Sequence, residues 1–174
     1  MSLRYATPVP GLTLRFGARE DIPVLLTLIR ELAQFEQLID QVTADENTLA
    51  EALFGSRPVA EAVLAELDGE PVGFAVFFHN FSTFVGRAGL YLEDLYVRPH
   101  ARGRGAGRWL ITFVAHVAVE RNCGRFEWAV LDWNTRAIDF YRALGAVPMD
   151  QWTIQRVTGD ALQRLGGHAF QPLT

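Results

Sequence analysis

Residues 97–108 have the sequence VRPHARGRGAGR, and this stretch decides the fold. It joins a strand-like segment at 90–97 to a long amphipathic segment at 103–121. Pro99 ends the strand, because proline restricts the preceding Arg98 to an extended conformation and offers no N–H donor. Glycines let the backbone approach a ligand closely, and the N–H groups of such a turn and of a helix N-terminus attract anions. We therefore predict a strand, a glycine-rich loop and a helix that together bind a pyrophosphate.

Two common phosphate sites do not fit this loop. All 16 basic residues are arginine, so the chain lacks the lysine of a Walker loop and of a Schiff-base enzyme. The glycines at 103, 105 and 107 come late in the chain and have the wrong spacing for a dinucleotide-binding fingerprint. The alternative is a glycine-rich loop with a solvated arginine face.

Outward from the loop, hydrophobic periodicity predicts alternating strands and helices. Asp21 opens a helix whose apolar stripe runs from Ile22 to Ala33, with Glu36 as the next position on it, either at a wet helix end or facing a pocket. Thr43, with Glu46 three residues on, opens a second helix. Further strands are expected at 12–16, 59–67, 71–78, 126–131 and 151–157, and further helices at 134–145 and 158–165. The order β-α-α-β-β-β-α-β-α-β predicts an α/β fold, a mixed central sheet with helices on both faces.

Length and composition limit the kind of protein. A chain of 174 residues and 19.4 kDa, 49% hydrophobic and 21% charged, fits a single globular domain over 1–174. No apolar run reaches the roughly 18 residues of a membrane span, and the first residues lack the apolar segment of a secretory signal. The single cysteine, Cys123, cannot form an internal disulfide, so we expect a cytoplasmic protein. The histidines have no ligand spacing and no aromatic platform is present, so we expect no metal and no nucleic acid.

Charge is divided unevenly along the chain. Residues 1–97 hold 14 acids against six arginines, a net of −8, whereas residues 98–174 hold six acids against ten arginines, a net of +4. The asymmetry is greatest at 20–70, with 12 acids against two arginines, a net of −10. This pattern suggests a cationic ligand that meets an anionic one, although plain surface charge would give the same pattern.

Four stretches resemble a known family. Arg102-x-x-Gly105-x-Gly107 after a strand resembles the acetyl-CoA motif of the GCN5-related N-acetyltransferases (GNAT). LYLEDLYV at 90–97, WN at 133–134 followed by IDFY at 138–141, and LIRELAQFE at 28–36 resemble the spermidine/spermine (diamine) acetyltransferases. The resemblance covers nearly the whole chain and implies an acetyl-CoA-dependent acyltransferase.

The resemblance implies where acetyl-CoA binds. Backbone N–H groups near a strand bulge, at Leu95, Tyr96 and Val97, would hold the acetyl carbonyl and the pantetheine arm. The pyrophosphate would lie on Arg102, Gly103, Arg104, Gly105, Ala106, Gly107 and Arg108. The next helix would contact the cofactor through Asn134, Thr135, Arg136 and Ala137.

Two catalytic residues follow from the same resemblance. Tyr141 lies two helical turns after Asn134 and, as in the family, would protonate the departing thiolate; a buried tyrosine that donates to a carbonyl is the alternative. Strict alternation puts Glu93 on one face with Tyr91, Leu95 and Val97, and Asp94 on the other, where we expect a structural role. Glu93 would act as base through water, through a raised pKa, or mainly by binding the ammonium.

The acceptor is the least determined part of the prediction. Substrate contacts are expected from Phe35, Glu36, Glu93, Glu127, Trp128, Ala129 and Asp150. The loop 80–87 has no acid and carries Arg87, which leaves open a diamine, a polyamine, thialysine or a lysine-like amino acid. The alternatives are an acetyltransferase for a protein N-terminus or an antibiotic, and a non-catalytic acyl-CoA-binding regulator. The family resemblance also implies a homodimer that pairs through the last strand and the closing helix.

Overall fold

The computed structural model describes residues 3–167, which form two compact units, 3–129 and 130–167, and each is described by itself. None of the helices in the described residues combines the length and apolar character needed to cross a bilayer. That residues 1–174 form a single domain stays a prediction.

A six-stranded mixed sheet is the centre of the first unit. Its strands lie in the order β1 (Arg4–Ala6), β2 (Leu12–Phe16), β3 (Glu61–Leu67), β4 (Glu70–Ser82), β5 (Arg87–Val97) and β6 (Phe126–Trp128). All neighbours pair antiparallel except β5 and β6, which are parallel because a helix connects them. The predicted hairpin turn at Asp68 and Gly69 is confirmed, and both residues have positive φ, 52° and 88°.

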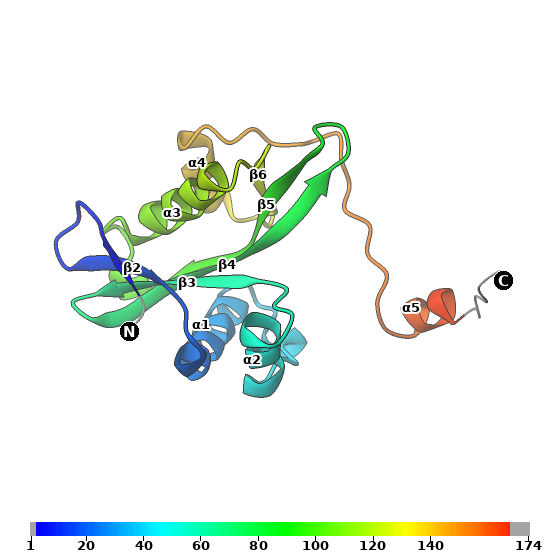
Figure 1. The fold of residues 1–174 in the computed structure, drawn as a ribbon, viewed down its shortest axis with the longest axis horizontal. Coiled ribbons are helices and arrows are strands. Elements are labelled where there is room, and N and C mark those ends of the chain that lie inside the picture. Colours follow the sequence, from blue (N-terminus) through cyan, green and yellow to red (C-terminus); the bar gives the residue numbers. More distant parts are fainter. Residues whose placement is uncertain (1–2, 168–174) are drawn as a thin grey trace. The chain divides into compact units, whose positions relative to one another are not determined.

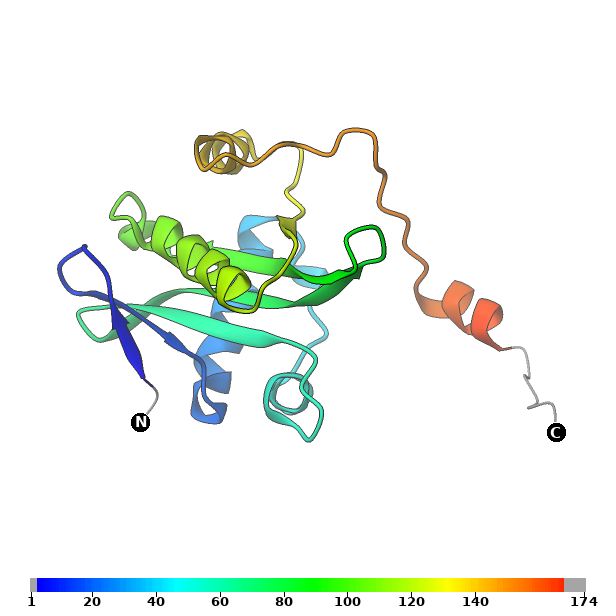
Figure 2. The same cartoon turned by 45° about the horizontal axis from the view of Figure 1, so that its top comes forward.

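Helices cover both faces of this sheet, as predicted (Figures 1 and 2). Helices α1 (Ile22–Phe35) and α2 (Glu46–Phe54) pack on one face, and α3 (Ala106–Glu120) packs on the other. The side chains that fill the α1 face are Ile22, Leu25, Leu28, Leu32, Leu53, Leu64, Phe74 and Tyr96. Each fully buried leucine stabilises the fold by about 1.5–3 kcal/mol, so the apolar stripes of the helices fix them on the sheet.

Two helices, α2 and α3, begin later than predicted. Helix α2 begins at Glu46, and its N-cap is Asp45, which accepts a hydrogen bond from the Thr48 N–H at 2.8 Å, so the predicted start at Thr43 is wrong. Helix α3 begins at Ala106 because the glycines before it adopt left-handed backbone.

The side chain of Asp21 does not cap α1. It accepts two hydrogen bonds from Arg15 and one from the Ala18 N–H. The nearby arginine outcompetes the helix N–H groups for this carboxylate, since a charge-assisted fork is the stronger interaction.

Strand β1 was not predicted. Its three residues are exposed and have no apolar alternation. Arg4 in β1 and Arg15 in β2 both bind the Glu66 carboxylate, at 2.9 and 2.7 Å. The strand therefore forms through an edge pairing and an ionic contact that periodicity does not reveal.

The second unit contains α4 (Thr135–Ala143) and α5 (Gly159–Gly166). Asn134 caps α4, as predicted, by accepting from the Ala137 N–H at 3.2 Å, and Gly145 follows the helix with φ 91°. The predicted strand at 151–157 is wrong: this segment is extended chain outside any strand. The described residues of this unit contain no strand with which the segment could pair. A single strand without a partner has no ladder of hydrogen bonds to stabilise it.

Candidate active site

A glycine-rich loop lies between β5 and α3. The strand ends at Val97, a short 3-10 turn spans Pro99–Ala101, and α3 begins at Ala106. Gly103 and Gly105 have φ of 77° and 89°, left-handed values that favour glycine. Gly105 is the N-cap and provides no side chain to satisfy the first N–H groups of α3, which are left for an anion.

The arginines of this loop have different surroundings. Arg104 and Arg108 are exposed, where a pyrophosphate would meet them. The Arg102 side chain instead turns back: its Nε donates to the Val97 carbonyl oxygen at 2.8 Å. Its guanidinium lies 4.8 Å from the Phe35 ring centre and 5.6 Å from that of Tyr96, a cation–π arrangement.

Strands β5 and β6 part just before the loop. Their pairing ends at Leu92 and Trp128, whereas β5 continues to Val97. In the described residues, β5 beyond Leu92 therefore has a ladder partner only in β4. Its backbone at Leu95, Tyr96 and Val97 is the stretch predicted to hold the acetyl carbonyl.

A β-bulge in β5 changes which side chains share a face. Asp94 pairs with Val76 and Leu92 pairs with Phe77, so Glu93 is an extra residue without a partner of its own. The predicted grouping of Glu93 with Tyr91, Leu95 and Val97 on one face is wrong, because an inserted residue reverses the alternation beyond it. Asp94 shares the α1 face with Val76, Phe74 and Tyr96.

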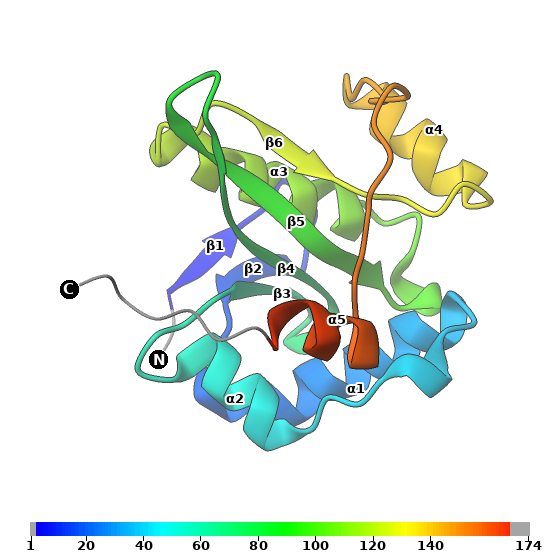
Figure 3. The ribbon, with the colours of Figure 1, turned by 90° about the vertical axis from the view of Figure 1, so that its right-hand side faces the viewer.

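Two carboxylates, Glu36 and Glu93, lie close enough to Asp94 for their charges to act on it. Burial raises the pKa of Asp94 to about 6, and the charges of Glu93 and Glu36 raise it further. Burial also raises the pKa of Glu36, which follows the last turn of α1. Figure 3 shows the end of β5 and the loop beyond it beside the end of α1. The sequence predicts a structural role for Asp94 on the opposite face, and only the exact position of the bulge, at Glu93, identifies it as a candidate site residue.

The remaining predicted residues are distributed over both units. Phe35 supports Arg102, and Glu127 accepts from Asn80 at 2.8 Å and pairs with Arg125 at 3.1 Å. Trp128 ends β6, and Ala129 follows it. Asn134, Thr135, Arg136, Ala137 and Tyr141 lie on α4 or at its start, and Asp150 follows it, all in the second unit.

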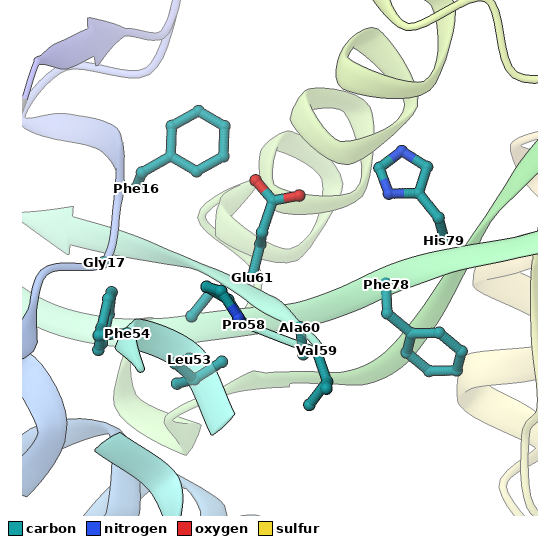
Figure 4. Close-up of a pocket in the computed structure, with 11 residues that line it drawn as sticks. Phe16, Gly17, Leu53, Phe54, Pro58, Val59, Ala60, Glu61, Phe78 and His79 are labelled. Atoms are coloured by element: carbon teal, nitrogen blue, oxygen red, sulfur yellow. The ribbon is translucent and has the colours of Figure 1, made fainter. Parts of the chain in front are cut away.

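A cavity of about 480 Å³ lies elsewhere in the first unit (Figure 4). Phe16, Leu53, Phe78 and His79 are among its lining residues, and none of the predicted site residues lines it. Its carboxylate, Glu61, is bound by Arg121. The cavity is therefore separate from the carboxylates and the glycine-rich loop.

A mixed sheet whose strands part beside a glycine-rich helix start fits the predicted acyl-CoA-dependent transferase. The chain belongs to the acetyltransferase (GNAT) family, whose model matches residues 26–146. It is 41% identical over 165 residues to a thialysine N-epsilon-acetyltransferase from Bos taurus, covering 88% of this chain and 96% of the relative. The predicted family and activity are confirmed: the chain is an acetyl-CoA-dependent N-acetyltransferase.

Two further similarities support this assignment. An L-ornithine N5-acetyltransferase from Arabidopsis thaliana is 32% identical over 197 aligned positions, covering 87% of this chain and 86% of the relative. Among solved structures, an integron cassette protein from the mobile metagenome of V. cholerae has a TM-score of 0.77 at 25% identity, covering 91% of this chain and 99% of that one. The predicted α/β fold class is thereby confirmed.

Proposed function

We propose that this enzyme acetylates a primary amine of a small cationic acceptor, and that Glu36, Glu93 and Asp94 bind the acceptor. The observation that carries this proposal is the bulge at Glu93, which puts Asp94 on the face covered by α1, where burial and the charges of Glu93 and Glu36 raise its pKa. Carboxylates held together in this way repel each other, and an ammonium among them relieves the repulsion. A cationic acceptor therefore gains more at this place than a neutral one.

A short acceptor with one or two charges fits the chain better than a long polyamine. Residues 20–70 carry a net charge of −10, which attracts cations, but the loop 80–87 has no acid to bind a distant second ammonium. Thialysine and ornithine, named by the two relatives, are both amino acids with a side-chain amine. We favour such a diamino acid, with a short diamine as the second choice.

The reaction is direct attack of the amine on the thioester. A lysine-like amine has a pKa of about 10.4, so its neutral form costs roughly 4–5 kcal/mol at pH 7. Glu93 is exposed at the bulge and would pass the proton to water, since a carboxylate is too weak a base to hold it. Backbone N–H groups at Leu95, Tyr96 and Val97 would stabilise the oxyanion, and Tyr141 would protonate the thiolate.

The acetyl-CoA would be anchored at two helix starts. The pyrophosphate would bind the backbone of 102–107 and the exposed Arg104 and Arg108. Asn134 and its neighbours through Ala137 would contact the cofactor from the start of α4. No residue in this scheme requires a metal.

We also propose that the protein is a cytoplasmic homodimer. Within segment 151–157 the apolar Trp152 and Ile154 stand two positions apart, and both are exposed within the second unit. A strand of a second copy would give this segment the hydrogen-bond ladder that it lacks within the described residues 3–167. The single Cys123 fits a reducing compartment.

An amine panel tests the proposed function. Release of CoA thiol from acetyl-CoA is measured with thialysine, ornithine, lysine, short diamines, spermine, an aminoglycoside and a peptide with a free N-terminus. We expect the highest kcat/KM with a diamino acid or a short diamine. A preference for the peptide or the aminoglycoside would contradict the proposed acceptor class. Tight acetyl-CoA binding without turnover on any amine would identify a non-catalytic regulator.

A further inference from the structure

The glycine-rich loop is tied to α1 by two arginines. Arg98 and Arg102 are four residues apart, and they contact Glu31 and Phe35, which are also four residues apart and lie on the same face of α1. The residue after Phe35 is Glu36, one of the three proposed acceptor carboxylates. The predicted cofactor loop thus contacts the helix that carries the acceptor site.

The Arg98 contact joins three elements. Its Nε donates to both Glu31 oxygens, at 3.2 and 3.0 Å, and one terminal nitrogen donates to Glu31 Oε1 at 2.8 Å. The other terminal nitrogen donates to the Pro71 carbonyl oxygen at 3.1 Å, at the start of β4. Glu31 raises the pKa of Arg98, and burial followed by Glu31 raises the pKa of the Tyr96 hydroxyl. A guanidinium fork of this kind fixes orientation as well as distance.

The Arg102 contact completes the link one helical turn later. Because its Nε is bound to Val97 at the end of β5, the guanidinium is held over the rings of Phe35 and Tyr96. A loop ordered by a pyrophosphate would hold Arg102 in this position, and with it the end of α1. The loop and the end of α1 lose conformational entropy when the first substrate binds, and this entropy is not lost again when the second substrate binds.

We propose that Arg98 and Arg102 are positioning residues that couple acetyl-CoA binding to acceptor binding through Glu31 and Phe35. This inference rests on the proposed function, because it needs an acceptor bound at Glu36 and Asp94. The two substrates would then bind with positive cooperativity, and by linkage each would raise the affinity of the other by the same factor.

The test measures thialysine binding by calorimetry, without CoA and with saturating CoA, on the full chain. For the natural protein we expect CoA to lower the thialysine Kd at least about fivefold, within the usual range of coupling. In Arg98→Gln and in Glu31→Gln the ratio of the two Kd values should fall below about two. The exchanged pair R98E/E31R should restore part of the ratio, which loss of folding would not allow.

The Arg121–Glu61 pair provides a matched control. It is a fork between β3 and the end of α3, and its side chains are 33% and 36% exposed, against 27% and 31% for Arg98 and Glu31. Arg121→Gln removes a similar ion pair but should leave the coupling ratio unchanged. Equal loss in Arg121→Gln, or full coupling in Arg98→Gln, would overturn the proposal.

The same measurement separates this inference from the proposed function. Binding of thialysine with equal Kd in the presence and absence of CoA would overturn the coupling alone. If none of the panel amines binds or is acetylated, the proposed acceptor class fails instead.

Discussion

Asp94 in β5 lies directly opposite Val76 in β4, whereas Leu92 lies opposite Phe77, so Glu93 has no residue of its own across the strand pair. This extra residue turns the side chain of Asp94 toward the face covered by α1. Two acids that are adjacent in sequence thereby meet a third, Glu36, from a distant segment, and the pKa of Asp94 rises to about 6 through burial and the charges of Glu93 and Glu36. The bulge thus produces a carboxylate that is costly to ionise unless a cation binds.

Replacement of Asp94 by asparagine should stabilise the protein and weaken acceptor binding. A carboxyl whose folded-state pKa is raised binds more protons when folded than when unfolded, so it lowers stability as pH rises from 4 through 6. At pH 8, Asp94→Asn should raise Tm by about 2–4 °C and raise the amine KM about tenfold. At pH 5 the Tm difference should be smaller, and it should vanish below about pH 4, where the carboxyl is protonated in the unfolded chain as well.

Thermal unfolding and initial rates at pH 5 and pH 8 check both effects. Glu51→Gln, at an exposed position of α2, removes one negative charge elsewhere and serves as the control. A Tm for Asp94→Asn below that of the natural protein at pH 8 would contradict the prediction, because it would show that a partner stabilises the ionised carboxylate.

A second prediction concerns the ion network under β1 and β2. Arg15 donates to Asp21 at 2.6 and 2.8 Å and to Glu66 at 2.7 Å, and Glu66 is 3% exposed. Arg15→Met leaves a buried carboxylate with one partner fewer and should cost about 3 kcal/mol of unfolding free energy. Urea unfolding measures the loss. Arg121→Met, at a half-exposed pair, should cost below about 1 kcal/mol, and equal costs for the two variants would contradict the prediction.

The acid dependence of stability gives this network a further test. The hydrogen bonds from Arg15 lower the pKa of Asp21, so its contribution is present above the ordinary pKa of an aspartate and is lost as pH falls through the lowered value. In Arg15→Met the unfolding free energy should therefore fall less steeply as the pH is lowered.

Periodicity and local chemistry predicted much of this molecule. The apolar stripes of α1 and α3, the cap at Asn134 and the glycine loop depend on residues a few positions apart, and all were found where expected. These features follow from backbone geometry, which nearby residues determine.

The features that were missed depend on distant partners. The family resemblance implied a bulge before the glycine-rich loop, but its exact position, at Glu93, is defined only relative to β4, and the position of the Arg102 side chain depends on Phe35 in α1. Strand β1 depends on an edge pairing with β2, and segment 151–157 finds no pairing strand among residues 130–167, the described part of its own unit. A sequence pattern read locally contains no information on such neighbours.

Tyr141→Phe should lower kcat by about 100-fold while the Kd for acetyl-CoA changes little. The phenol is the proposed proton donor to the thiolate, and Tyr141 follows the Asn134 cap by two turns of α4. Steady-state rates and calorimetric titration of CoA check the two quantities separately. Phe140→Leu, at the neighbouring ring, is the packing control, and an unchanged kcat in Tyr141→Phe would remove the tyrosine from the mechanism.

The proposed homodimer should give a particle of twice the 19.4 kDa chain mass in light scattering. Ile154→Lys introduces a charge into the apolar pair of Trp152 and Ile154 in segment 151–157 and should shift the population to monomer. The polar neighbour Thr153→Lys is the matched control and should leave the mass unchanged. A monomeric natural protein at working concentration would contradict the proposal.

The acidic residues of the first half should make acceptor binding sensitive to salt. Glu36 is the partly buried C-cap of α1, and in the proposed function its charge attracts the acceptor ammonium. Salt screens this attraction over a Debye length of about 8–10 Å. The amine KM should therefore rise several-fold between low and high salt, and Glu36→Gln should raise it at low salt and flatten the salt dependence, while Glu51→Gln should do neither. Initial rates at two ionic strengths measure this. A salt-independent KM, or a clear preference for spermine over every shorter amine, would show that the acidic segment does not recruit a small cation.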